Sequence, residues 1–137
     1  MSEFKRFGYD CNNGLNCFNV KHRLDFRHFF DCLPGKISMT DIDATVEVCG
    51  HFLFMEMKRG QDELPFGQAL YFKNLTLLSD KIAVLIVHGD SETMQCHALR
   101  HVWKGVIYPW VNASFDEVKD IIRQWADVAM KPIKTVA

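Results

Sequence analysis

The sequence predicts an α/β (α+β) fold in which a central mixed β-sheet is flanked by helices. Residues 52–57 and 82–87 are short, mostly apolar runs of strand length. Residues 67–78 and 114–130 are longer and carry apolar side chains at helical spacing. Strands and helices follow one another along the chain, and helices packed on a sheet are the layered arrangement that this order favours.

Length and composition predict one globular domain spanning residues 1–137. The chain is 48% hydrophobic and 24% charged, and its formal net charge is −1. No run of about 20 apolar residues could cross a membrane, and the segment MSEFKRFGYD lacks the apolar stretch of a signal peptide. We therefore expect a cytoplasmic protein that makes no membrane contact. The near-neutral charge neither predicts nor excludes a nucleic-acid partner, because the spatial distribution of charge decides that.

The first half of the chain contains an expected helix and an expected hairpin. Residues 21–33 have a helical pattern that ends at Pro34-Gly35. Residues 45–47 and 52–57 are expected strands, joined by a turn at 49–51 that contains glycine. The second strand is apolar at its start, so we expect it at the centre of the sheet, covered on both faces.

The second half contains a helix at 67–78, a buried strand at 82–87 and a late helix. A loop is expected to start at Gly89-Asp90. Residues 92–104 fit neither a helix nor a strand clearly. Ser114 and Glu117 have the spacing of a capping box, which opens a helix running to about Met130.

Asp43, Glu56 and Lys58 are the candidate catalytic residues. Side chains alternate along a strand, so Glu56 and Lys58 point to one face and Met57 to the other. If the two strands pair around Gly50, Asp43 lies near Glu56. Two carboxylates supply the hard oxygen ligands that Mg²⁺ or Mn²⁺ prefers, and a nearby lysine can position a water and offset their charge. The set suits metal-dependent hydrolysis of a phosphodiester.

The same residues resemble the PD-(D/E)xK nuclease superfamily, whose motif is an aspartate, a hairpin and then Glu-x-Lys on the second strand. The spacing is similar to that of archaeal-type Holliday-junction resolvases, and residues 24–90 look like small nuclease-like proteins of bacteriophages. The resemblance implies a restriction-endonuclease-like core and Mg²⁺-dependent DNA cleavage. It further implies that Asp43, Glu56 and the Met57 carbonyl hold the metal, and that Lys58 activates the water.

Some positions depart from the family pattern or have open roles. Ile42 stands where the family has proline, and Asp41 is a second candidate for the acid. Gln68, three residues before Tyr71, resembles the Gln-x-x-x-Tyr motif of recombination nucleases with the tyrosine one place early. Gln68 could bind phosphate, hold the lysine, or be an ordinary surface glutamine.

Arginines 23, 27 and 59 are candidate contacts to a DNA backbone, although such residues are often only solvated. Trp110 either packs in the core or stacks on a base. By analogy with resolvases, a homodimer with paired sites on branched DNA is expected.

The first functional hypothesis is a metal-dependent endodeoxyribonuclease acting on branched or structured DNA in phage replication or recombination. The alternative is a non-catalytic protein with the nuclease fold that inhibits or recruits a host defence or repair factor. The near-neutral charge favours the alternative, and so does a first helix that offers only Asp25 and Asp31 where many members have a glutamate. A restriction-like enzyme is a third hypothesis, but no separate recognition domain is evident.

Overall fold

The computed structural model describes residues 25–61, 63–90 and 92–132. They belong to two units, residues 1–40 and residues 41–137, and each is described by itself. In the first unit, η3 (Phe26–Cys32) is a 3-10 helix that begins at Asp25, whose side chain accepts a hydrogen bond from the Arg27 N–H. None of its residues is buried. Of the helix expected at 21–33, residues 26–32 form a more tightly wound 3-10 helix, and residues 21–24 lie outside the described part.

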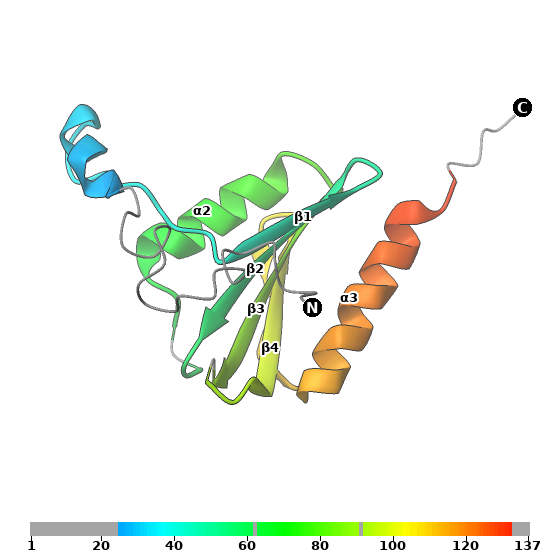
Figure 1. Cartoon of the computed structure of the whole chain (residues 1–137). Helices are drawn as coiled ribbons and strands as arrows, with labels where there is room; N and C mark the ends of the chain where they lie inside the picture. Colours follow the sequence, from blue (N-terminus) through cyan, green and yellow to red (C-terminus); the bar gives the residue numbers. More distant parts are fainter. Residues whose placement is uncertain (1–24, 62, 91, 133–137) are drawn as a thin grey trace, which may run out of the picture. The chain divides into compact units, whose positions relative to one another are not determined.

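The described residues of the second unit form a mixed α+β fold with a six-stranded sheet and two helices (Figure 1). This confirms the predicted mixed sheet with helices. In the order β1-β2-β3-β4-β5, only β2 and β3 run parallel, and β6 pairs with β4. The elements are β1 (Ala44–Val48), β2 (His51–Lys58), α2 (Phe66–Leu77), β3 (Ile82–Asp90), β4 (Gln95–Trp103), β5 (Val106–Ile107), β6 (Val111–Asn112) and α3 (Phe115–Met130).

The expected hairpin forms between β1 and β2, with Ala44 opposite Met55 and Val48 opposite His51. Cys49 and Gly50 make the turn with positive φ angles of 48° and 83°. Glycine adopts such a conformation without the steric cost of a Cβ. The Glu47 carboxylate also accepts a hydrogen bond from the Gly50 N–H at 2.7 Å, which holds the turn closed.

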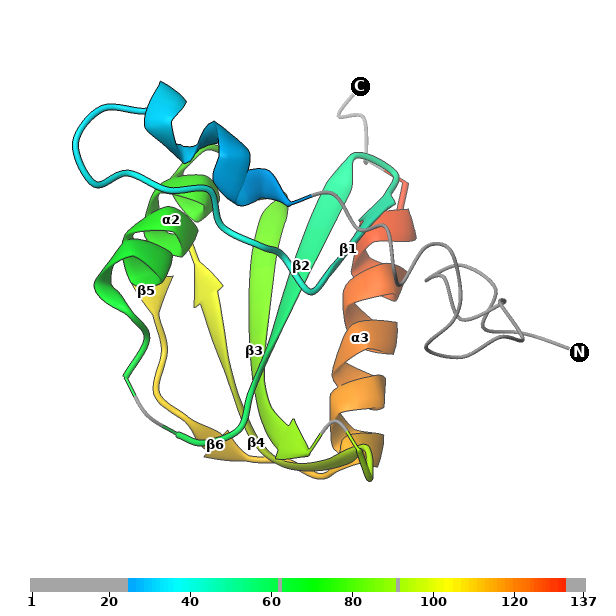
Figure 2. The same cartoon turned by 60° about the vertical axis from the view of Figure 1, so that its left-hand side comes forward.

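The sheet lies between the two helices, with α2 on one face and α3 on the other (Figures 1 and 2). Against α3 pack odd-numbered strand residues such as Leu53, Leu85 and Leu99, together with Val118 of the helix. Against α2 pack the even-numbered residues Val84, Ile86 and Val102, together with Phe72. The central strands are thus covered on both faces, as the apolar runs predict.

β3 and β4 extend beyond what the sequence pattern shows. β3 continues through Gly89 to Asp90, where a loop was expected, and residues 95–103 of the ambiguous segment form β4. The pairing shifts register between His88 and Gly89, so that His97 is an extra residue in β4. A Cβ on Gly89 would lie 2.5 Å from the Gln95 carbonyl oxygen. The close strand approach at this bulge therefore requires glycine.

The late helix begins and ends where the sequence predicts. The Ser114 side chain accepts from the Glu117 N–H, and the Glu117 side chain accepts from the Ser114 N–H, which is a complete capping box. The helix ends at Met130. Within residues 25–61, 63–90 and 92–132, neither helix length nor apolar content is sufficient anywhere for a membrane crossing.

Candidate functional site

Glu56 and Lys58 lie near the carboxyl end of β2, on the face that α2 covers. Glu56 is only 8% exposed, and its Oε1 accepts a hydrogen bond of 2.9 Å from Nε2 of Gln68 in the first turn of α2. The Lys58 Nζ lies 3.4 Å from the same Oε1, and the lysine side chain is 28% exposed. The crossover helix therefore closes over the end of β2 and brings Gln68 to the predicted Glu-x-Lys pair.

Two oxygens of this group are buried without a hydrogen-bond donor. They are Glu56 Oε2 and Gln68 Oε1, neither of which has a partner within the described part of the chain. A buried acceptor without a partner costs about 1–3 kcal/mol, and a buried carboxylate needs a counter-charge. The arrangement is rich in acceptors and fits a cation.

Asp43 is held at the sheet edge, opposite the end of the Glu-x-Lys segment. The exposed Asp43 directly precedes β1, and its Oδ2 accepts a hydrogen bond of 2.8 Å from the Met57 N–H. The N–H and C=O of one strand residue face the same neighbouring strand. The Met57 carbonyl therefore faces the Asp43 side of β2, beyond the last β1 pair at Ala44 and Met55.

The structure brings the predicted set together in part by direct contact and in part by strand register. Gln68, Glu56 and Lys58 are in direct contact, whereas Asp43 joins them through the backbone of Met57. The second oxygen of Asp43, the unpartnered oxygen of Glu56 and the Met57 carbonyl are oxygen atoms of the kind that Mg²⁺ binds. No cluster of three or more His, Cys, Asp or Glu side chains suitable for a metal occurs among the described residues. A site with two carboxylates suits Mg²⁺, which keeps several of its waters.

The other predicted residues are placed less centrally. Asp41 is exposed and precedes β1. Arg59, also exposed, lines a cavity of about 330 Å³ together with Gly89, Asp90 and Glu92, at the carboxyl ends of β2 and β3. Two carboxylates there share the space with the arginine.

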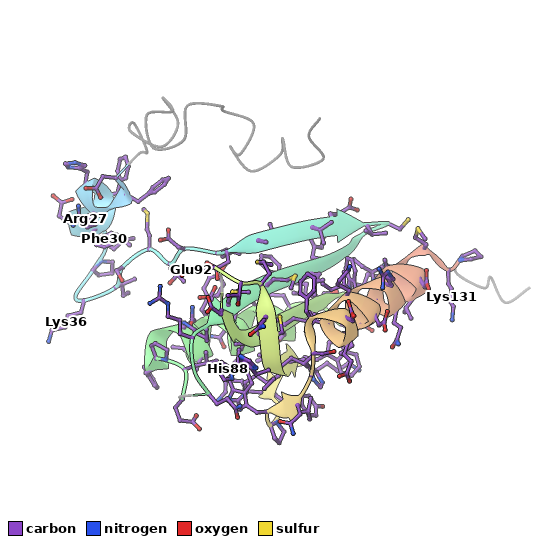
Figure 3. All side chains as sticks on the ribbon, turned by 60° about the horizontal axis from the view of Figure 1, so that its bottom comes forward. Arg27, Phe30, Lys36, His88, Glu92 and Lys131 are labelled. Carbon is purple, nitrogen blue, oxygen red and sulfur yellow. The ribbon has the colours of Figure 1, made fainter. Side chains whose placement is uncertain are left out.

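Two of the predicted DNA-binding arginines, Arg23 and Arg27, belong to the first unit. Arg23 lies outside the described residues. Arg27, labelled in Figure 3, forms a 2.7 Å ion pair with Asp25. The Arg27 guanidinium lowers the pKa of the Asp25 carboxyl to about 2. Asp25 thus offsets the charge that Arg27 would offer to DNA.

His88 is a residue that the sequence analysis did not single out. It lies directly opposite Lys58 in the parallel register, and strand alternation places its side chain on the α2 face with those of Val84 and Ile86. The Gln61 amide lies 3.3 Å from His88 Nδ1. Nδ1 accepts from this amide in the tautomer that carries the ring proton at Nε2. Only the parallel pairing of β2 and β3 reveals this neighbour, because no local motif includes it.

Comparisons of this chain with protein-family models, with curated proteins and with solved structures found no match.

Proposed function

We propose that this protein is a metal-dependent endodeoxyribonuclease with a PD-(D/E)xK core. The observation that carries the proposal is the Glu56 carboxylate, which is buried next to Lys58 and Gln68 and has one oxygen without a donor. An acid in this state costs stability unless a ligand compensates it. A cation at Glu56 would compensate the buried negative charge.

The topology supports a restriction-endonuclease-like core. An aspartate precedes β1, an antiparallel hairpin leads to Glu-x-Lys at the end of β2, and α2 then leads to β3, parallel to β2. This is the order that the sequence resemblance implies for the superfamily. Here it puts an acid from each hairpin strand at the same end of the sheet.

Asp43, Glu56 and the Met57 carbonyl are the groups that would hold Mg²⁺. When bound, the ion supplies positive charge opposite the phosphate and acidifies a water. The Met57 N–H fixes the Asp43 carboxylate, and the Gln68 amide fixes that of Glu56. The protein thus orients both acids before any ligand arrives, which reduces the cost of binding.

The Lys58 ammonium is a hydrogen-bond donor at the edge of this acidic group. Its Nζ is 3.4 Å from Glu56 Oε1, and the side chain keeps access to solvent. An ammonium in this position can orient an attacking water and stabilise negative charge developing on the phosphate. Gln68 acts through Glu56 and is therefore a positioning residue.

We propose branched or structured DNA as the substrate, within a phage-infected cell and with a homodimer supplying paired sites.

Cleavage of defined DNA structures tests the proposal. Purified protein would be incubated with a four-way junction, a nicked duplex and single-stranded DNA in Mg²⁺, Mn²⁺ or EDTA. We expect metal-dependent cutting that falls by at least about a hundredfold in Glu56→Gln and Lys58→Met, because each removes a group that acts in the transition state. Gln68→Ala should lose less, since it acts only through Glu56.

Asp127→Asn is the matched control, because Asp127 is an exposed acid of α3, on the opposite face of the sheet. It should cut as the wild type does. Cutting that persists in Glu56→Gln, or in EDTA, would contradict the assigned site. A folded wild type that cuts none of the three substrates in either metal would refute the nuclease.

A second candidate function has one specific observation in its favour. The outer side of α2 exposes large apolar side chains: Phe66 is 84% exposed, Leu77 is 64% exposed, and Leu78, directly after the helix, is 77% exposed. Such a surface is typical of a protein-binding site. If the nuclease assay is negative, a non-catalytic protein that binds a host factor through α2 becomes the better account. Phe66→Ser and Leu77→Ser would then abolish capture of that factor.

A further inference from the structure

Arg100 is a buried cation that the proposed mechanism does not use. It lies in β4 opposite Ile86, so its side chain is on the α2 face, the same face as Glu56 and Lys58. Only 9% of its surface is exposed. One of its five N–H donors, at Nε, bonds to the Tyr108 carbonyl oxygen at 2.9 Å.

Arg100 has no acidic partner in residues 25–61, 63–90 and 92–132, where the three ion pairs all involve other residues. A buried guanidinium without a carboxylate is costly, because desolvation is not repaid by an opposite charge. Arginine is also the side chain whose planar fork matches the oxygens of a phosphate. An anionic ligand would complete this environment.

The neighbours of Arg100 are donors as well. Its guanidinium carbon lies over the Trp110 ring, 5.2 Å from the centroid, in a cation–π contact. The Trp110 Nε1–H is buried and has no acceptor among the described residues. The centroid of the His88 ring lies 6.3 Å from that of the same indole, and Gln61 contacts this ring at Nδ1, which leaves Nε2 outside that contact.

The α2 face therefore separates two kinds of group. Around Glu56 and Gln68, two buried oxygen acceptors are left without donors, whereas the buried Trp110 N–H is left without an acceptor among the described residues. Arg100, next to Trp110, has no acidic partner among these residues either. Glu56 and Arg100 both lie opposite Ile86, one on each side, so their Cα atoms are two strand spacings apart, roughly 10 Å. Separate phosphates of one strand can reach two such points.

We propose that Arg100, supported by Trp110 and flanked by His88, binds a DNA phosphate next to the one that is cut. The inference rests on the proposed nuclease for its substrate, and on the burial and contacts of Arg100 for its site. Arg100 contacts the strand and fixes its register across the sheet, whereas Glu56 and Lys58 act on the scissile phosphate. His88 extends the contact towards Lys58, its partner in the parallel register.

The test compares Arg100→Met with Arg123→Met. Arg123 is an exposed arginine of α3, paired with Asp120 at 2.8 Å on the opposite face of the sheet. Binding of a labelled four-way junction and a labelled single strand would be measured over a range of salt concentrations, with Ca²⁺ in place of Mg²⁺. One lost phosphate contact reduces the salt slope by about 0.9. In Arg100→Met we expect this smaller salt slope, an affinity about tenfold lower, and an increased KM with kcat nearly unchanged. In Arg123→Met we expect none of these changes.

Equal salt slopes and equal KM in Arg100→Met and the wild type, with cleavage intact, would overturn this inference and leave the nuclease standing. If Arg100→Met does not fold, the wild type is tested instead, and its arginine Nε–H resonances are followed by NMR. The Arg100 resonance, assigned from its absence in Arg100→Lys, should shift saturably with a 5′-phosphorylated dinucleotide while that of Arg123 stays in place. No shift would overturn the subsite. A shift without cleavage of any DNA would support the anion subsite and refute the proposed function.

Discussion

Replacing Glu56 by glutamine is expected to stabilise the metal-free protein while removing its response to metal. The substitution keeps the shape of the side chain and deletes its charge. It also replaces the unpartnered Oε2 by an NH₂ group, next to a Gln68 whose Oε1 is itself a buried acceptor without a donor. The interaction of Oε1 with the Gln68 amide can persist, because a carboxamide oxygen also accepts.

The magnitude follows from two opposing effects. Leaving a buried acceptor without a donor costs about 1–3 kcal/mol, and the substitution relieves that cost. The ion pair with Lys58 is lost, but Lys58 is 28% exposed, and partly exposed pairs contribute at most about 1 kcal/mol. The net gain in the free energy of unfolding is about 1 kcal/mol, which raises Tm by about 4 °C in a domain of this size.

Metal should stabilise the wild type but not Glu56→Gln. A ligand at ten times its Kd adds about 1.4 kcal/mol to the stability of the state that binds it. Thermal unfolding followed by circular dichroism, in EDTA and in a series of Mg²⁺ and Mn²⁺ concentrations, measures both effects. The wild type should gain stability with metal, and Glu56→Gln should start higher and stay constant.

Asp127→Asn controls for the simple loss of one negative charge, because this acid is exposed on α3. It should retain the metal response of the wild type. A Glu56→Gln protein that is less stable than the wild type in EDTA by 1 kcal/mol or more (about the value of the ion pair itself) would refute the reasoning. Glu56 would then be a structural partner of Lys58.

Two further predictions concern residues outside the site. Thr76 is fully buried in α2, and its Oγ1 accepts from the Gly105 N–H at 2.9 Å. Thr76→Val should lower the urea midpoint by the equivalent of about 1–3 kcal/mol, because the Gly105 N–H loses its acceptor. A smaller change would mean that a water replaces the hydroxyl. The His101 ring stacks on Tyr108. The loss of part of the ring's hydration lowers the pKa of His101 below the usual 6.5. The unfolded chain then binds more protons between the two pKa values, so stability should fall as the pH decreases through and below 6.5. Urea unfolding across pH 5–8 should show this dependence weakened in His101→Gln, and an unchanged profile would assign it to another group.

Much of the fold was predictable because the signals are local. The turn at Cys49 and Gly50, the caps of α3 at Ser114 and Glu117, and the apolar runs of β2 and β3 depend on backbone conformation or on side-chain period within a few residues. η3 shows the limit of such reasoning. No residue of η3 is buried, and its helical pattern forms a 3-10 helix in place of an α-helix, because tertiary packing stabilises most α-helices.

β4 was ambiguous because what makes it a strand is distant in sequence. Residues 95–103 have no strict alternation, and they are ordered by pairing with β3 on one side and with β5 and β6 on the other. The bulge at His97 also breaks the period of two that the pattern requires. Strand continuation through Gly89 was missed for the same reason, since a glycine there indicates a loop until its partner strand is known.

The sequence by itself determined the order of elements, the hairpin and the shared face of Glu56 and Lys58, because strand alternation is a property of the backbone. Only the tertiary structure decided which distant groups meet them. Gln68 reaches Glu56 because α2 crosses back over β2. Asp43 accepts from the Met57 N–H because the pairing of β1 with β2 stops at Ala44 and Met55, two residues before Met57. The pairing of β3 with β2 on one side and with β4 on the other likewise puts Arg100 on the same face as Glu56. These contacts depend on how three non-adjacent segments pack, and no short window of sequence contains that information.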